Sequence, residues 1–143
     1  TPFPCFKFRT MCKDAERHTG PVWASADDPR ITRVGRFLRM SRMDELPQLI
    51  NVLRGDMSLV GTRPIRQFYA DQLAELIPFY DLRFIEKPGL TGWAQVKYRY
   101  SSSITEQIEK FYYDYYYIRN RSIALDLYII LLTAAVTVRM KGA

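Results

Sequence analysis

The chain has 143 residues, of which 48% are hydrophobic and 25% are charged, with only 7 Gly and 8 Pro. This length and composition predict one globular domain and exclude collagen-like, low-complexity and wholly disordered chains. Lysine and arginine outnumber aspartate and glutamate by 21 to 15, so the net charge is +6, which suits an anionic partner such as nucleic acid, a phosphorylated substrate or an acidic membrane.

Disulfide frameworks and metal knuckles are also excluded, because the chain has only two cysteines, Cys5 and Cys12, and one histidine, His18. We assign His18 no role. No apolar stretch near residue 1 resembles a signal peptide, and the sustained apolar run at 127–138 is too short to cross a bilayer. These features favour a reducing, cytosolic setting.

The first predicted element is a short strand over residues 3–11. Phe6 and Phe8 alternate with Lys7 and Arg9, which is the period of a half-buried strand.

A helix is predicted after the turn at Asp28 and Pro29, because apolar residues then recur at helical spacing: Ile31, Val34, Phe37 and Leu38. Arginines stand at every third position along this helix and its exit: Arg30, Arg33, Arg36, Arg39 and Arg42. One side is therefore strongly basic. It suits a nucleotide diphosphate, anionic lipid headgroups, or simply solvent.

A second helix is predicted from the stripe Leu46, Leu49, Ile50 and Leu53, with Gly55 at its left-handed stop. Proline lacks an N–H and is tolerated only in the first helical turn, so Pro47 makes Asp44 the N-cap and Glu45 the first helical residue. The helix end then holds Asp44 ionised, as a carboxylate nucleophile requires. The alternative is that the two acids only stabilise the helix start.

Residues 57–60 predict a short strand, followed by a turn over residues 61–64. Arg63 in this turn has a planar group that suits a bidentate phosphate contact, although a solvated turn arginine is the simpler alternative. The helix that follows ends at Pro78 and has the apolar stripe Ile65, Phe68, Tyr69, Leu73, Leu76 and Ile77.

Two further helices complete the chain. After a break at 87–89, Val96 and Tyr98 alternate with Lys97 and Arg99, and Ser103 with Glu106 then forms a capping box. Its helix has the apolar residues Ile104, Ile108, Phe111, Tyr112 and Tyr115. Ser122 caps the last helix, whose stripe faces inward or towards a membrane: Ile123, Leu127, Ile130, Leu131, Ala134 and Val138.

These elements predict an α+β fold, a helix-dominated single domain over residues 1–143 with a few short strands. Asp114 and Asp126 stand twelve residues apart in the last two helices, where each suits a structural partner for an N–H group or an arginine.

Several motifs together resemble the bacterial sugar transferases, the monotopic phosphoglycosyl transferases that act on polyprenyl phosphate. They are KFRTM at 7–11, DDPRITRVGRFLR at 27–39, DELPQLINVLRGDMSLVGTRP at 44–64, KPGLTGWAQV at 87–96 and the YYI-N-S-LDL pattern at 116–127. Motifs of this length, in this order, cover nearly the whole chain.

The resemblance implies a two-step, Mg²⁺-dependent transfer of a sugar phosphate from a UDP-sugar to undecaprenyl phosphate. This reaction would begin exopolysaccharide or glycoconjugate assembly at the cytoplasmic face of the bacterial inner membrane. By similarity, Asp44 would attack the sugar-linked phosphorus and release UMP, and Glu45 would be an Mg²⁺ ligand. A carboxylate next to a metal would also have a low pKa.

The family's other functional positions map onto both charge types in this chain. Its phosphate-binding positions fall on Lys7, Arg39 and Arg63, and on Arg99 if Tyr98 and Tyr100 replace a glycine and an asparagine. Its remaining acidic positions fall on Asp114 and Asp126.

Two departures from the family pattern bear on these expectations. Thr62 changes the usual GPRP turn but leaves Arg63 and Pro64 in place. The apolar, membrane-dipping helix that the family has before KFRTM is missing from the sequence, so we expect this chain to be a fragment of a longer protein that is held at the membrane by what precedes residue 1. The chain itself would contact lipid through amphipathic surfaces such as the last helices.

Two other function classes remain open at this point. Net positive charge and abundant aromatic residues also suit a basic nucleic-acid-binding module, although no helix-turn-helix, zinc or RNP signature accompanies them. A non-catalytic scaffold would keep the fold without the reaction, which the intact Asp44, Glu45 and Arg63 argue against. The sequence leaves a homo-oligomer open and does not identify the sugar.

Overall fold

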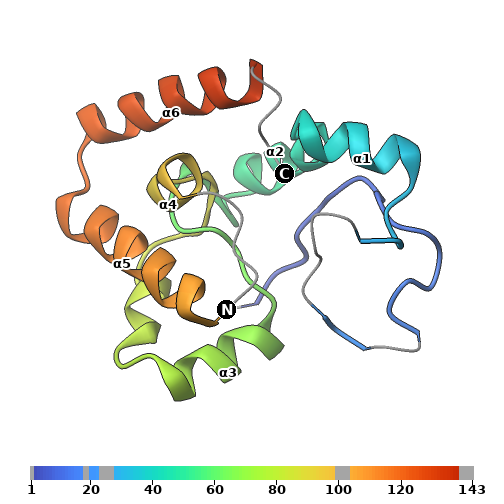
Figure 1. The fold of residues 1–143 in the computed structure, drawn as a ribbon. Coiled ribbons are helices and arrows are strands. Elements are labelled where there is room, and N and C mark those ends of the chain that lie inside the picture. The colour runs from blue at the N-terminus through green and yellow to red at the C-terminus, as the bar shows by residue number, and fades with distance from the viewer. Residues whose placement is uncertain (1, 18–19, 23–27, 99–103, 139–143) are drawn as a thin grey trace.

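The structure is a computed structural model that describes residues 2–17, 20–22, 28–98 and 104–138 (Figure 1). In chain order the elements are α1 (Arg33–Met40), the 3-10 helix η1 (Met43–Glu45), α2 (Gln48–Leu53), β1 (Ser58–Val60), α3 (Gln67–Leu76), the 3-10 helix η2 (Tyr80–Phe84), β2 (Gly89–Thr91), α4 (Trp93–Lys97), α5 (Ile104–Asn120) and α6 (Ile123–Val138). The predicted helix-dominated domain is therefore confirmed. The predictions for His18, Arg99 and the capping residue Ser103 fall outside the described residues.

A two-stranded parallel sheet lies at the centre of the described fold. Ser58 of β1 is opposite Gly89 of β2, and Val60 is opposite Thr91. The predicted strand at 57–60 is thus confirmed as β1. The chain between the two strands contains α3 and η2, and α4 then packs against α5 and α6, as Figure 1 shows. The alternation at 96–100 does not make a strand in its described part, because Trp93–Lys97 forms α4.

Glycines allow the ends of this sheet to approach closely. A Cβ on Gly92 would overlap the carbonyl oxygen of Gly61, so neither strand could keep its place with a larger residue there. The N–H of Gly61 donates to the carbonyl of Thr91 at 2.9 Å, which extends the pairing one residue beyond β1. The chain therefore leaves the sheet two residues before Arg63, so the sheet fixes the position of the Arg63 backbone.

Two apolar clusters hold the helices against this centre. The first joins α3, η2 and α5 through Ala70, Leu73, Ile77, Tyr80 and Phe111. The second joins β1, α5 and α6 through Val60, Tyr117 and Ile129. Burial of such side chains is the main driving force that fixes α5 between the two clusters.

The predicted strand over residues 3–11 is wrong. The described part of this segment is extended, but its only ladder contact is an isolated bridge between Met11 and Ile31. The alternating pattern indicated an extended backbone, but in the structure no neighbouring strand pairs with the described part of this segment. Other groups bond this backbone instead, as when the N–H of Phe8 donates to the carbonyl of Asp44 at 2.9 Å.

The amino-terminal segment packs directly on α1. Thr32 caps this helix by accepting a hydrogen bond from the N–H of Gly35 at 2.9 Å. Gly35 is buried because the carbonyl of Thr10 lies where a Cβ would stand. The predicted helix after Asp28 is confirmed, and its glycine is explained by this close approach.

Many apolar side chains that we expected inside are exposed. The predicted stripe of α2 is open to solvent, most of all at Leu53, which is 88% exposed. On α6 the fully buried residue is Ile129, whereas exposed side chains make up most of the predicted stripe: Ile123, Leu127, Ile130 and Leu131. The inward alternative is therefore wrong for these four. Among the described helices, none combines the length and apolar character needed to cross a membrane.

Candidate active site

The acid pair lies in the 3-10 turn η1, not at the N-cap of an α-helix as predicted. Asp44 and Glu45 are both buried, and α2 begins only at Gln48, after Pro47. Proline explains the offset, since it has no N–H to join the helix ladder. Arg42, which precedes the turn, has a positive φ of 55°, a conformation that L residues adopt only where the surrounding structure enforces it.

Asn51 holds the amino-terminal segment over this turn. Its side-chain oxygen accepts from the N–H of Phe6 at 3.0 Å, and its amide donates to the carbonyl of Pro4 at 2.8 Å. With no exposed surface, Asn51 is a rigid anchor. The bond from Phe8 to Asp44 closes the other side, so Lys7 is placed between two fixed points.

Glu45 is held by two cations. Nζ of Lys7 lies 3.0 Å from its Oε1, and the guanidinium of Arg63 donates to both of its oxygens. Burial opposes the charge on Glu45, but Arg63 and Lys7 outweigh it and lower the pKa of Glu45 to about 2. The carboxylate of Glu45 in turn raises the pKa of Arg63, against the effect of burial. Glu45 is therefore ionised at neutral pH.

Asp44 differs from its neighbour. Among the described residues no cation lies within ion-pair distance of its carboxylate. Burial and the charge of Glu45 raise its pKa, although Lys7, Arg39 and Arg63 act in the opposite direction. The low pKa predicted for Asp44 assumed a neighbouring metal ion. The protein's own groups raise the pKa instead, because the acid is buried beside a second carboxylate.

The arginine series divides between structure and site. Arg30 pairs with Asp28, and Arg33 and Arg36 are exposed. Arg39 donates from Nε to the hydroxyl of Thr10 at 2.9 Å, and its charge reaches Asp44. The structure therefore places Lys7 and Arg63 on Glu45 and brings the charge of Arg39 close to Asp44, and the phosphate-binding role of these three residues stays a prediction.

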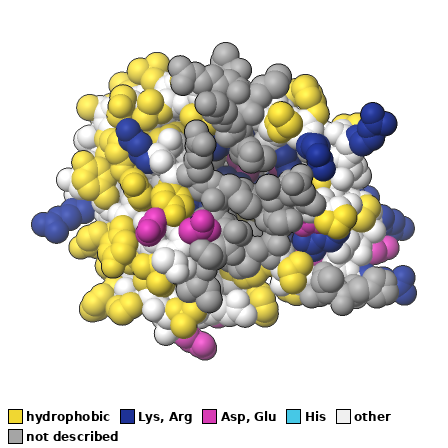
Figure 2. Space-filling view, viewed as in Figure 1, with side chains coloured by type: hydrophobic (Ala, Val, Ile, Leu, Met, Phe, Trp, Pro, Cys, Tyr) yellow, Lys and Arg dark blue, Asp and Glu magenta, His cyan; other side chains and the backbone are white. Residues whose placement is uncertain are grey.

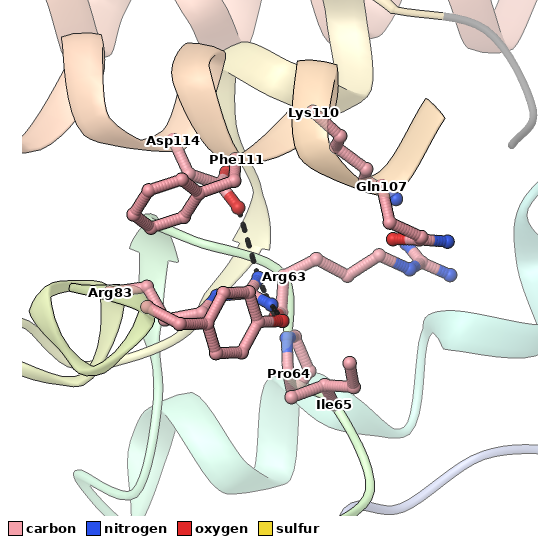
Figure 3. Close-up of a pocket in the computed structure, with 9 residues that line it drawn as sticks. Arg63, Pro64, Ile65, Arg83, Gln107, Lys110, Phe111 and Asp114 are labelled. Carbon is pink, nitrogen blue, oxygen red and sulfur yellow. Dashed lines mark hydrogen bonds and ion pairs between the residues drawn. The ribbon is translucent and has the colours of Figure 1, made fainter. Parts of the chain in front are cut away.

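A second acidic position is connected to the site through an arginine that the sequence analysis missed. Nη2 of Arg83 lies 2.9 Å from the carboxylate of Asp114 and 3.0 Å from the carbonyl of Arg63 (Figure 3). The alternative prediction, that Asp114 is a structural partner of an arginine, agrees with this contact. Arg83 stood out in the sequence only as a charge within an apolar run, 79–85.

Asp126 is not joined to this network by any contact within the described chain. Its carboxylate accepts a hydrogen bond from the hydroxyl of Tyr117 at 2.8 Å. Tyr117 and Ile129, one turn beyond Asp126, belong to the second apolar cluster. The structure places Asp126 as a support for α5 and α6.

Two cavities lie near the acid pair: one is lined by Arg63, the partner of Glu45, and the other by Glu45 itself. A small one of about 90 Å³ lies behind Arg63, between η2 and α5, and is drawn in Figure 3. A larger one of about 540 Å³ lies between η1 and α6, with Arg42 and Glu45 at one part of its wall. Most of its other walls are apolar or hydroxyl side chains: Met43, Leu46, Leu59, Leu90, Thr91, Ile130, Thr133, Ala134 and Thr137.

The residues present fit a metal ion only in company with a substrate. Within the described ranges, no group of three or more His, Cys, Asp or Glu side chains could hold one. Both oxygens of Glu45 already face cations. Mg²⁺ is commonly bound through one or two carboxylates and completes its shell with water and substrate phosphates. Asp44 and Glu45 suit that open arrangement and not a closed metal cage.

Comparison with known proteins agrees with the motif resemblance. The family model described as "Bacterial sugar transferase" matches residues 1–140. The chain is 45% identical, over 99% of its length, to the UDP-N-acetylgalactosamine-undecaprenyl-phosphate N-acetylgalactosaminephosphotransferase of Aeromonas hydrophila, of which it covers 33%. It is 45% identical, over 92% of its length, to the UDP-glucose:undecaprenyl-phosphate glucose-1-phosphate transferase of Escherichia coli (strain K12), of which it covers 29%.

A third relative is named for a different sugar. The chain is 39% identical, over 99% of its length, to the undecaprenyl-phosphate galactose phosphotransferase of Salmonella typhimurium, of which it covers 31%. The chain thus spans about a third of the length of these relatives. Their names specify three sugars, so the similarity does not single out one.

Proposed function

Since the chain belongs to the bacterial sugar transferase family, we propose that it transfers a sugar phosphate from a UDP-sugar to undecaprenyl phosphate and releases UMP. The observation that carries this proposal is the asymmetry of the acid pair. Glu45 is clamped by Lys7 and Arg63, whereas the carboxylate of Asp44 has no ion pair within the described residues. An acid held by no cation is the one whose lone pairs remain available for attack.

In the proposed reaction an oxygen of Asp44 forms a bond to the sugar-linked phosphorus of the donor. The bond from that phosphorus to the bridging oxygen breaks, and UMP leaves with the electron pair. A phosphate oxygen of undecaprenyl phosphate then attacks the same phosphorus, and the bond to Asp44 breaks. The second step restores the carboxylate, so the two steps balance without an oxidant or a reductant.

The cations around Asp44 would position the phosphates and neutralise the charge that spreads over their oxygens. Phosphoryl transfer depends mainly on such positioning and electrostatic stabilisation. Lys7 and Arg63 have fixed partners and Arg39 is bonded to Thr10, so all three are ordered before a substrate arrives. Arg99 keeps its proposed phosphate role by family resemblance alone.

We also propose that Glu45 binds Mg²⁺ that enters with the donor's diphosphate. Such an ion would supply further neutralisation of phosphate oxygens when bound. Glu45 suits this role because it stays ionised over a wide pH range, with its pKa lowered to about 2.

The larger cavity suits the isoprenoid chain of the acceptor. Its apolar walls begin beside Glu45 and Arg42, so a lipid phosphate near the acid pair would place the attached hydrocarbon next to them. A polyprenyl tail is the occupant that combines this chemistry with the required position. A bound polyprenyl tail would cover this larger cavity, an apolar groove between η1 and α6 that the fold leaves open.

Exposed apolar side chains support a position at the membrane surface. Figure 2 shows hydrophobic side chains gathered over α5 and α6. On α6, the side chains of Leu127 and Leu131 are 58% and 69% exposed. We propose that the protein acts at the cytoplasmic face of the inner membrane. Flotation with anionic liposomes should show salt-sensitive association, and association should weaken in a Leu127→Glu/Leu131→Glu variant. Absence of binding at every salt concentration would refute this placement.

The covalent step is tested by quenching the reaction with acid and mapping the peptides by mass spectrometry. The full-length protein, incubated with UDP-sugar and Mg²⁺ but no acceptor, should add the mass of a sugar phosphate at Asp44. Asp44→Asn should give neither adduct nor product while it stays folded. Product formation without an adduct, or an active Asp44→Asn enzyme, would overturn the mechanism.

A further inference from the structure

A positively charged side chain, that of Lys110, lines the small cavity behind Arg63 and has no role in the reaction proposed above. Lys110 reaches from α5 towards the guanidinium of Arg63, as Figure 3 shows. The cavity has a volume of about 90 Å³. This space is enough for a small polar group such as a phosphate.

Positive charge exceeds negative charge on the walls of this cavity. Three cationic side chains line it, from Arg63, Arg83 and Lys110, but Asp114 is the only carboxylate among the lining residues. Asp114 is already paired with Arg83, and Arg63 is paired with Glu45. Within the described part of the chain, Lys110 makes no ion pair.

The polar groups of Arg83 show the same imbalance. Its two terminal nitrogens are bonded to protein groups, but its buried Nε has no partner among the described residues. Donors therefore outnumber acceptors in and around the cavity. An anion with several oxygens would correct both the charge and the hydrogen-bond balance.

We propose that Lys110 and Arg63 together bind the uridine-linked phosphate of the donor, the group that leaves as the phosphate of UMP. This assignment rests on the proposed function. Arg63 connects the two places, since it contacts Glu45 beside Asp44 and also lines the cavity. A diphosphate with its sugar-linked phosphorus at Asp44 would extend along Arg63, so its second phosphate would meet Lys110.

The charge of Lys110 is set by its surroundings. Burial and the charges of Arg63, Arg83 and Arg42 lower the pKa of Lys110 to about 8, against the attraction of Asp114. Lys110 is therefore mostly protonated at neutral pH and loses its charge as the pH rises through 8. A phosphate dianion keeps its charge over this range because its second pKa is about 6.

Binding of UMP to the full-length protein, followed by calorimetry, tests the site without turnover. Lys110→Met should weaken UMP binding about 10- to 100-fold, the usual worth of a charge-assisted hydrogen bond. Lys110→Arg should bind nearly as the wild type does. Arg119→Ala, an exposed position on the same helix, is the matched control and should change nothing.

The pH dependence separates a phosphate contact from a packing role. Affinity of the wild type for UMP should fall above pH 8, whereas Lys110→Arg should keep its affinity and Lys110→Met should be low and flat. Equal losses in Lys110→Met and Lys110→Arg, or no loss in either, would overturn the site. In turnover assays KM for UDP-sugar should rise in Lys110→Met; a rise only in KM for undecaprenyl phosphate would overturn the donor assignment.

Failure of the proposed function would be recognised independently. A protein that binds UMP through Lys110 but never forms the Asp44 adduct would contradict the covalent mechanism and leave this site standing. A protein that forms the adduct but binds UMP equally well in Lys110→Met would contradict only the site.

Discussion

Lys7 and Glu45 are 38 residues apart in the chain, yet Nζ of Lys7 lies 3.0 Å from Oε1 of Glu45. The contact depends on an extended segment that is held by Asn51 at Phe6 and by the carbonyl of Asp44 at Phe8. The backbone thus delivers Lys7 to the acid pair, and Lys7 helps to fix the charge of Glu45.

Replacing Lys7 with alanine should therefore impair transfer more than folding. Loss of the ammonium removes one of the two cations on Glu45, so the pKa of Glu45 should rise and one phosphate contact should be lost. We expect kcat/KM for UDP-sugar to fall about 10- to 100-fold. The lysine side chain is 39% exposed, so the melting temperature should change little.

Lys13→Ala is the control for this variant, because Lys13 is exposed in the same amino-terminal part of the chain. It should retain wild-type kinetics. Equal activity of Lys7→Ala and Lys13→Ala would show that Lys7 has no part in the reaction.

The groove between η1 and α6 predicts a defect confined to the second half of the reaction. Ala134→Phe would fill part of the apolar cavity and compete with the acceptor's hydrocarbon chain. We expect KM for undecaprenyl phosphate to rise at least tenfold, while the rate of adduct formation from UDP-sugar stays near that of the wild type. Rapid-quench measurement of the two half-reactions distinguishes these steps.

Ala135→Phe makes the same change one residue further along α6, outside the lining of the groove. Both half-reactions should remain near wild-type rates in this control. A defect in adduct formation in Ala134→Phe would show that the groove serves the donor or the fold instead of the acceptor.

The helices and their caps could largely be predicted from the sequence, because their signals are local. Ser122 caps α6 by accepting a hydrogen bond from the N–H of Leu125 at 3.2 Å, and Gly55 ends the α2 region with a positive φ of 80°. Lys7, Arg39 and Arg63 around the acid pair also followed from the motifs. Each of these statements depends on a few neighbouring residues or on a family pattern.

The rest depended on contacts between distant segments. Periodicity gave α2 an apolar stripe but did not reveal that Leu53 faces solvent, since a pattern does not identify what covers it. Likewise, Arg83 and Lys110 converge on Arg63 only because η2 and α5 pack together through the first apolar cluster. The spacing of Lys110 and Asp114 at i and i+4 was the only local signal, and alone it fits an ordinary helix pair.

Acid should weaken the turn before α1 through one carboxylate. Hydrogen bonds from the Arg30 side chain lower the pKa of Asp28 from 3.8 to about 2. A lowered pKa means that the ionised form is favoured in the folded protein, so its stabilisation is full above pH 4 and is lost as the pH falls towards 2. At neutral pH, Asp28→Asn should lower the free energy of unfolding by about 1 to 2 kcal/mol.

Urea unfolding of the wild type and Asp28→Asn from pH 7 to pH 2 measures this effect. The difference between their free energies of unfolding should shrink steadily below pH 4. A difference that does not depend on pH would mean that the shape of the side chain, and not its charge, supports the turn.

The buried pair of Arg83 and Asp114 should show strong coupling in a double-mutant cycle. Their side chains are only 7% and 4% exposed, so removing either partner leaves a desolvated polar group. Arg83→Met and Asp114→Leu should each cost about 3 kcal/mol or more, and the double variant should cost much less than their sum. The exposed pair of Arg66 and Glu16, whose side chains are 60% and 38% exposed, should show coupling below about 1 kcal/mol.

Because Arg83 also donates to the carbonyl of Arg63, a refolded double variant should still transfer sugar phosphate more slowly. Additive losses at the buried pair, or full activity of the double variant, would remove Arg83 as the support that positions Arg63.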